Sequence, residues 1–225
     1  YARSHASSCN RNAGKEKMRH SYFKIPGWFN YSETYDIIVD QISSNGKIIE
    51  IGSFLGRSTH YLATSLYNVS KDNVKIYSVD TFEGSSEHMN IDLPKNFKHI
   101  FEKNLDFFIE RGMVEVCQGR SDSQEVLNKF EDESIDYIMV DGAHEYDAVV
   151  DDITNWWPKL KETGAMVGDD YLLNSVSEAV KEGFTKLQVP NFGANRGVEQ
   201  TWYCAKNGEN EVFQKIIPGV NTLKK

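Results

Sequence analysis

Short runs of β-branched and aliphatic residues alternate along the chain with longer segments of helical periodicity. Five such runs, at 47–51, 75–79, 114–118, 135–140 and 165–168, each end at or just before a glycine or an aspartate. Runs of this length bounded by turn residues predict buried strands. Because helical segments separate them, the strands are expected to be parallel neighbours in one sheet.

The segments between the runs carry apolar residues three and four positions apart, which predicts helices over about 57–66, 96–110, 123–130, 146–160 and 176–181. The strongest pattern is that of 146–160, where Val149, Ile153 and Trp156 share a face. Asp151 and Asp152 lie towards its N-terminal end, where the helix dipole favours acidic residues, and we expect both on a solvated face.

The sequence predicts further elements before the first of these strands and after the last of these helices. Ser32 can cap a helix that runs to about Ser43 and lies over the main domain. The runs 184–189 and 200–205 are too close in sequence for a helical crossover and predict an antiparallel pair at one sheet edge. The predicted fold is therefore α/β, a doubly wound, mostly parallel sheet with an antiparallel edge pair. We expect a flexible tail at 1–20 and a single domain at 21–225, whose residues 21–45 form a helical cap.

Composition narrows the function classes. The 225 residues are 40% hydrophobic, which allows a sizeable core, and the net charge of −8 argues against a nucleic-acid partner. Apolar runs stay far below the roughly 20 residues of a membrane helix. Cys9, Cys117 and Cys204 have no metal-type spacing and suit free thiols in a reducing, cytoplasmic compartment.

Candidate chemistry lies just after the predicted strands, because the carboxyl ends of parallel strands share one edge of a sheet. These positions hold Gly52 and Ser53, Asp80 and Thr81, the segment 119–121, Asp141, and the pair Asp169 and Asp170. Gly52 and Gly56 allow a tight nucleotide-type turn before a helix. The turn is neither G-x-G-x-x-G, since Phe54 holds the second glycine position, nor a P-loop, so pyrophosphate binding is disfavoured.

The acidic residues at this edge indicate a cation. Asp141, Asp169 and Asp170 would repel one another unless protons or a metal ion intervened. Mg²⁺ is the first choice, with Ca²⁺ and Mn²⁺ left open; alternatively, these carboxylates only cap turns and bond to backbone amides. His144, three residues beyond Asp141, is the candidate general base, although a structural histidine is the alternative.

Five segments carry a family resemblance: 50–58 (EIGSFLGRS), 79–84 (VDTFEG), 119–121 (GRS), 138–160 and 164–171 (GAMVGDDY). Together they resemble the class I S-adenosylmethionine-dependent methyltransferases over about residues 27–205. The spacing from Asp-Gly-x-His-x-Tyr to Gly-Asp-Asp-Tyr is similar to that of the metal-dependent O-methyltransferases of the macrolide and sugar-tailoring type. More distantly, it resembles catechol O-methyltransferase.

The resemblance implies a binding site for S-adenosylmethionine. The cofactor-binding residues it implies are Glu50, Gly52, Ser53, Gly56, Ser58, Asp80, Thr81, Phe82, Ser121 and Asp141, of which Gly52, Ser53, Gly56 and Ser58 would line the methionine end. Asp80 would hold the ribose, Ser121 would flank the adenine, and Glu50 would anchor the loop or the amino group. The family often has Trp where Phe82 stands. A divalent cation, with Mg²⁺ as the first choice, would be held by Asp141, Asp169 and Asp170. Together with a base at His144, it would serve methyl transfer to a small-molecule hydroxyl on a sugar, a glycosylated natural product or a polyphenol.

Other functions stay open at this stage. A metal-independent methyltransferase and a noncatalytic cofactor-binding scaffold keep the same fold, whereas the broken glycine fingerprint disfavours a nicotinamide-dependent oxidoreductase. The aromatic segment 22–31 predicts either an acceptor wall or core packing, and it would suit a homodimer contact. The polar segment 82–96, with His88, could form a lid over the cofactor or contact the acceptor.

Overall fold

The structure is a computed structural model that describes residues 16–84, 96–195 and 197–207. One sheet of seven strands has the order β3-β2-β1-β4-β5-β7-β6. Five strands are parallel: β1 (Lys47–Ile51), β2 (Lys75–Asp80), β3 (Val114–Gln118), β4 (Ile135–Val140) and β5 (Leu160–Gly168). At one edge, β7 (Trp202–Ala205) runs antiparallel to β5 and pairs with β6 (Gly193–Ala194). The predicted fold class is confirmed.

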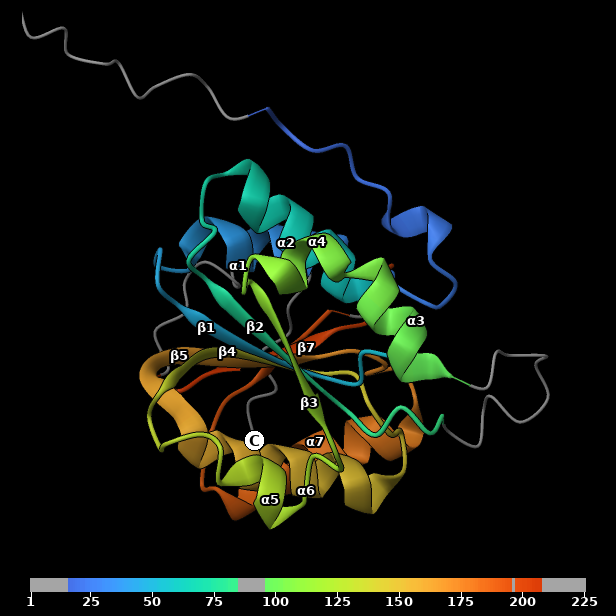
Figure 1. The fold of residues 1–225 in the computed structure, drawn as a ribbon. Helices are drawn as coiled ribbons and strands as arrows, with labels where there is room; N and C mark the ends of the chain where they lie inside the picture. The colour runs from blue at the N-terminus through green and yellow to red at the C-terminus, as the bar shows by residue number, and fades with distance from the viewer. Residues whose placement is uncertain (1–15, 85–95, 196, 208–225) are drawn as a thin grey trace, which may run out of the picture.

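Helices cover both faces of the sheet (Figure 1). One layer holds α1 (Ser32–Gln41), α2 (Arg57–Asn68), α3 (Phe97–Asn104) and α4 (Asp106–Glu110); the other holds α5 (Gln124–Leu127), α6 (Tyr146–Trp156) and α7 (Asn174–Lys186). Strand residues alternate between two apolar clusters, as Ile48 in one and Ile49 in the other illustrate. Burial on both faces explains why the parallel strands are continuous apolar runs.

The predicted strand at 184–189 is wrong. Helix α7 continues to Lys186, and Phe184 is 1% exposed on its buried face. Val180 and Phe184, four positions apart, share that face, and the Phe184 ring packs 5.5 Å from Trp157 and 5.8 Å from Trp202. The apolar residues of this segment follow helical spacing, so the segment continues α7 and does not form a strand. The strand that pairs with β7 at the antiparallel edge is β6.

Several helix boundaries also differ from the prediction. The helix expected over 96–110 breaks at Leu105, which is fully buried between α3 and α4. Asn104 donates its side-chain amide to the Leu55 carbonyl at 2.8 Å, and the turn lets Phe108 reach the core as well. The helix expected to reach residue 160 ends at Trp156, followed by the 3₁₀ turn η3 (Trp157–Lys159).

The N-terminal segment lies along α2 before it enters α1. Residues 1–15 of the expected tail lie outside the described residues, but Met18 exchanges two hydrogen bonds with the Asn68 side chain, at 2.7 and 2.9 Å. After the 3₁₀ turn η1 (Tyr22–Lys24), Arg57 donates to the Gly27 carbonyl at 2.7 Å. The single-domain boundaries stay a prediction.

Ser32 does not cap α1, because the residue at the cap position is Tyr31 and no side chain of the local sequence bonds there. The carboxylate of Glu199 instead accepts hydrogen bonds from the amides of Glu33 (2.6 Å) and Thr34 (3.2 Å). A distant acid thus caps the helix. In the part of the chain that the structure describes, helices long and apolar enough to cross a bilayer are absent.

Candidate functional site

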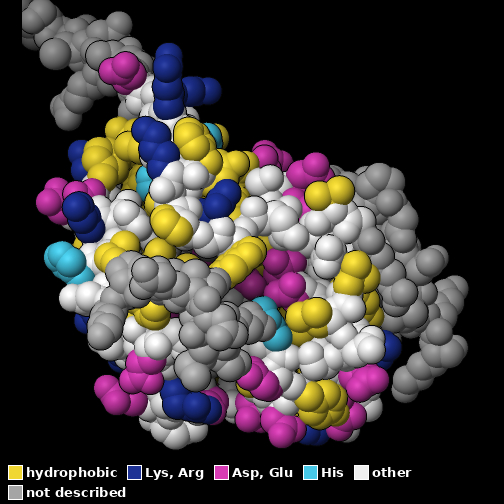
Figure 2. All heavy atoms as spheres, turned by 90° about the vertical axis from the view of Figure 1, so that its right-hand side faces the viewer, with side chains coloured by type: hydrophobic (Ala, Val, Ile, Leu, Met, Phe, Trp, Pro, Cys, Tyr) yellow, Lys and Arg dark blue, Asp and Glu magenta, His cyan; other side chains and the backbone are white. Residues whose placement is uncertain are grey.

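A hollow of about 1280 Å³ opens at the carboxyl ends of the parallel strands. Its walls include residues that follow all five of these strands, together with Gly27–Asn30 of the N-terminal segment and Gln200. Figure 2 shows acidic side chains gathered in a recess of this face, with a histidine at its border. The sheet topology therefore brings the predicted site residues to one edge.

The turn after β1 fixes the floor of the hollow. Gly52 has φ +85°, and a Cβ there would lie 1.9 Å from the Asp141 carbonyl oxygen. The Asp141 amide donates to the Ile51 carbonyl at 2.9 Å, so the ends of β1 and β4 touch. Only glycine combines this positive φ with so close an approach to the Asp141 carbonyl. The turn places Ser53 and Ser58 on the wall of the hollow.

Asp80 at the end of β2 holds this turn from the side. Its carboxylate accepts hydrogen bonds from the amides of Ser53 and Phe54, each at 2.8 Å, and from the Phe82 amide at 2.7 Å. Thr81 and Phe82 also line the hollow, and the Phe82 ring packs 5.3 Å from Phe101. Asp80 is therefore engaged by backbone amides on the wall where the sequence predicts a ribose contact.

Glu50 and Gly56 lie behind the wall. Glu50 is fully buried and accepts hydrogen bonds from the hydroxyls of Tyr35 (2.6 Å), Ser53 (3.0 Å) and Thr59. Burial raises the pKa of Glu50. Gly56 packs against α3, since a Cβ there would meet Leu105 at 2.4 Å. Both residues are placed to support the turn from inside.

At the other end of the hollow, the Ser121 hydroxyl donates to Asp152. The expectation of a solvated Asp152 is wrong, because this side chain is 3% exposed on the sheet-facing side of α6. Burial raises its pKa to about 7. The sequence signal was its spacing, three residues after Val149 and four before Trp156, within the apolar stripe.

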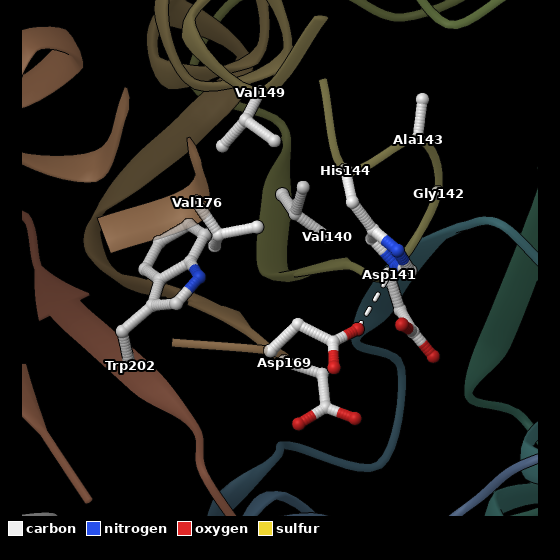
Figure 3. A pocket seen from close by; sticks show the side chains of 10 residues that line it. Val140, Asp141, Gly142, Ala143, His144, Val149, Asp169, Val176 and Trp202 are labelled. Carbon is white, nitrogen blue, oxygen red and sulfur yellow. Dashed lines mark ion pairs between the residues drawn. The ribbon is translucent and has the colours of Figure 1, made fainter. Parts of the chain in front are cut away.

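The acid cluster comprises Asp141 at the end of β4, Asp169 and Asp170 after β5, and His144. Figure 3 shows Asp141, His144 and Asp169 converging on one small pocket. The His144 Nε2 lies 2.9 Å from an Asp170 carboxylate oxygen. Asp170 has φ +58°, a conformation that aspartate adopts more readily than most residues. The predicted acidic residues and the predicted base are therefore neighbours.

The electrostatics of the acid cluster favour a bound proton or cation. Burial, and then the charge of Asp169, raises the pKa of Asp141 well above its usual range. Burial raises the pKa of Asp169 to about 7. Among the described residues, Asp169 Oδ1 is buried with no hydrogen-bond partner. Asp141, His144 and Asp170 each offer a ligand atom, and these atoms all lie within 4.8 Å of one another.

The aromatic segment before α1 divides between the hollow and the core. Trp28, 66% exposed, lines the hollow with Phe29 and Asn30. Tyr31 is fully buried, and its hydroxyl donates to Asp141 Oδ2 at 2.7 Å. Sequence reasoning missed this contact because nothing in the local pattern relates residue 31 to residue 141. His88 and residues 85–95 of the predicted lid segment lie outside the described residues.

Solved structures share this fold. A protein from Corynebacterium glutamicum aligns with a TM-score of 0.58 and 16% identity, over 82% of this chain and 84% of that one. The O-methyltransferase NovP aligns with a TM-score of 0.57 and 16% identity, over 78% of each chain. A candidate caffeoyl-CoA O-methyltransferase from Staphylococcus aureus gives 0.53 and 16%, over 80% and 85%.

No curated protein matches the chain in sequence. A family model described as a methyltransferase domain matches residues 49–171, which is more than half of the chain. The matched region includes the turn at Gly52, the Asp80 wall and the whole acid cluster. The chain therefore belongs to the methyltransferase domain family, which confirms the prediction of a class I S-adenosylmethionine-dependent methyltransferase.

Proposed function

We propose that the protein transfers the methyl group of S-adenosylmethionine to a hydroxyl of a small molecule, with a divalent cation at the acid cluster. The observation that carries this proposal is the convergence of three aspartates and a histidine on the wall of the hollow, beside the glycine turn. Oxygen as the acceptor atom is also supported by the similarity of the fold to NovP, which is named an O-methyltransferase.

The donor set fits a hard divalent cation. Asp141, Asp169 and Asp170 offer carboxylate oxygens, one of which is buried without a partner in the described chain. Buried carboxylates that repel one another favour a bound cation over ionisation alone, and Mg²⁺ prefers oxygen ligands. When bound, such a cation would make an acceptor hydroxyl more acidic and help to orient it.

His144 is proposed as the base that receives the hydroxyl proton. The acceptor oxygen attacks the methyl carbon, the new C–O bond forms as the S–C bond breaks, and S-adenosylhomocysteine leaves. The Asp170 carboxylate, 2.9 Å from Nε2, orients the imidazole and stabilises it once protonated. Holding the two reactants in line can contribute about 7–11 kcal/mol, more than the roughly 3–5 kcal/mol of a 10²–10⁴-fold effect of the base, so positioning by the walls of the hollow is the larger contribution.

A second role for His144 has its own support. The side chains that offer ligand atoms within 4.8 Å of one another are Asp141, His144 and Asp170. In this alternative, Asp141, His144 and Asp170 would hold the cation, and Asp169 would not be a ligand. Removal of a base lowers turnover and leaves metal affinity unchanged, whereas removal of a ligand lowers metal affinity as well.

The test is methyl transfer from labelled S-adenosylmethionine to a panel of sugars, glycosylated natural products and polyphenols. We expect turnover with Mg²⁺, loss with a chelator, and recovery when Mg²⁺ is restored. Asp169→Asn should remove most turnover while S-adenosylhomocysteine affinity stays within about twofold, since the variant keeps the side-chain shape. Asp151→Asn is the matched control, because Asp151 is exposed on the rim of the same hollow.

Each alternative predicts a different result. Turnover that a chelator leaves unchanged would identify a metal-independent methyltransferase. Cofactor binding without turnover on any acceptor class would favour a scaffold domain. Either result would overturn the proposed mechanism.

A further inference from the structure

The acid cluster accepts a hydrogen bond from a residue outside positions 49–171, the region that matches the family model and that we call the family region. Tyr31 lies before α1, whereas the family model covers residues 49–171. Its hydroxyl nevertheless donates to Asp141 Oδ2 at 2.7 Å. Tyr31 is fully buried, so this contact depends on how the N-terminal segment packs over the ends of the strands.

Aromatic packing holds the Tyr31 ring in place. Its centroid is 4.8 Å from the Phe29 ring, at 88°, and 5.2 Å from the Tyr35 ring, at 84°. Edge-to-face contacts of this kind restrict a ring on two sides. The hydroxyl therefore has a defined position relative to β4.

A capped helix terminus fixes the backbone next to Tyr31. Glu199, 5% exposed, accepts hydrogen bonds from the amides of Glu33 and Thr34 and from the Thr34 hydroxyl, the last at 2.7 Å. The neighbouring Val198 carbonyl accepts from the Asn30 side chain at 3.4 Å. The segment before β7 thus joins the N-terminal segment on both sides of Tyr31.

The hydrogen bond from Tyr31 to one carboxylate oxygen of Asp141 affects how this carboxylate can bind a metal ion. The bond at Oδ2 fixes the plane of the Asp141 carboxylate and leaves Oδ1 and the second lone pair of Oδ2 available. Metal-binding carboxylates are usually held by such outer hydrogen bonds, whose loss weakens metal affinity about 10–100-fold.

We propose that Tyr31 is a positioning residue that orients the Asp141 carboxylate for a divalent cation, and that the Glu199 cap on α1 keeps Tyr31 in place. This inference rests on the proposed metal at the acid cluster. It adds that the cluster is completed by the N-terminal segment and the segment before β7, both outside the family region.

The chain offers a matched control one helical turn away. Tyr35 is also fully buried, and its hydroxyl donates to a carboxylate, Glu50, at 2.6 Å. Glu50 lies behind the wall of the hollow and outside the acid cluster. Tyr35→Phe keeps the ring that packs against Tyr31 and removes a buried hydroxyl–carboxylate bond outside the acid cluster, whereas Tyr31→Phe removes one at the cluster itself.

The experiment is a Mn²⁺ titration of the full chain, followed by electron paramagnetic resonance, with S-adenosylhomocysteine affinity measured in parallel. We expect Tyr31→Phe to bind Mn²⁺ about 10–100-fold more weakly and Tyr35→Phe to stay within about twofold of the wild type. S-adenosylhomocysteine affinity should be unchanged in Tyr31→Phe, whereas in Tyr35→Phe it should fall, because Glu50 supports the turn after β1. With Mg²⁺ at saturation, turnover of Tyr31→Phe should recover most of the wild-type kcat, since positioning affects metal affinity first.

The outcomes separate the two proposals. Mn²⁺ binding to the wild type with equal affinity in Tyr31→Phe would overturn the role of Tyr31 and leave the metal site intact. Absence of Mn²⁺ binding to the wild type would overturn the metal site and the role of Tyr31 together. Should Tyr31→Phe fail to fold, Glu199→Gln decides: weakened Mn²⁺ binding supports the positioning role, and unchanged binding overturns it.

Discussion

At the scale of single residues, two neighbouring aspartates of α6 have opposite environments. Asp151 is exposed at the rim of the hollow, whereas Asp152 is 3% exposed and accepts a hydrogen bond from the Ser121 hydroxyl. Removal from water penalises the ionised carboxylate more than the neutral one, and burial raises the pKa of Asp152 to about 7. The ordinary value of about 3.9 applies in the unfolded chain.

This difference predicts a pH dependence of stability. Between about pH 4 and 7 the folded chain keeps the Asp152 proton and the unfolded chain has lost it, so the free energy of unfolding falls as pH rises through this window. Asp152→Asn stays neutral and keeps the acceptor oxygen. Its stability relative to the wild type should therefore rise with pH and level off above 7, by up to about 4 kcal/mol at 1.36 kcal/mol per pKa unit.

Urea unfolding at pH 5, 6 and 8, without cofactor, measures this effect. Asp151→Asn serves as the control and should follow the wild-type curve at each pH. If the curves of Asp152→Asn and the wild type stay parallel across the range, the buried proton does not exist.

His144 makes a second residue-scale prediction. If it is the base, His144→Ala should lower turnover by about 10²–10⁴-fold at pH 7 and less at pH 9, where the acceptor hydroxyl needs less assistance. Mn²⁺ affinity should then stay near the wild-type value. A loss of Mn²⁺ affinity, with equal losses of turnover at both pH values, would assign His144 to the ligand set instead.

At the scale of elements, the β1–α2 turn connects the cofactor wall to the acid cluster. Gly52 has φ +85°, and its Cα faces the Asp141 carbonyl so closely that a Cβ would lie 1.9 Å from that oxygen. Gly112 offers a comparison, since its φ is +63° but a Cβ there would meet only the end of the Lys75 side chain, at 3.0 Å.

The two glycines therefore separate backbone strain from a clash. Gly112→Ala should cost about 1–2 kcal/mol, the penalty of left-handed backbone with a Cβ. Gly52→Ala should cost more and also weaken S-adenosylhomocysteine binding, because the end of β4 must move. Thermal unfolding and calorimetric titration measure both. Equal stability losses with intact binding in both variants would show that the approach of Gly52 to Asp141 is unimportant.

Comparison of the predicted and observed elements shows which parts of the fold and the site the sequence pattern is sufficient to predict. The five parallel strands could be predicted because burial on both faces leaves continuous apolar runs, and the strand ends then brought Asp141, Asp169 and Asp170 together. Phe184 was misassigned because a short run of β-favouring residues also fits the end of an amphipathic helix. Tyr31 and Glu199 could not be predicted, since their roles depend on the path of two distant segments over the sheet.

At the scale of the whole molecule, the hollow is bounded by turns that follow every parallel strand. A ligand that fills it contacts several turns at once, each connected to the core through a strand. Binding energy is therefore coupled to the stability of the whole sheet rather than to one loop. The unfolded chain lacks this site, so ligand binding stabilises the folded state by mass action.

S-adenosylhomocysteine at 100 times its Kd should add about 2.7 kcal/mol to the free energy of unfolding. For a chain of this size, that corresponds to a rise of about 5–10 °C in Tm, measurable by differential scanning fluorimetry. NADH at the same concentration should leave Tm unchanged, because Phe54 interrupts the dinucleotide fingerprint and Asp80 is already bonded to the turn. A larger shift with NADH than with S-adenosylhomocysteine would contradict the assignment of the hollow to the sulfonium cofactor.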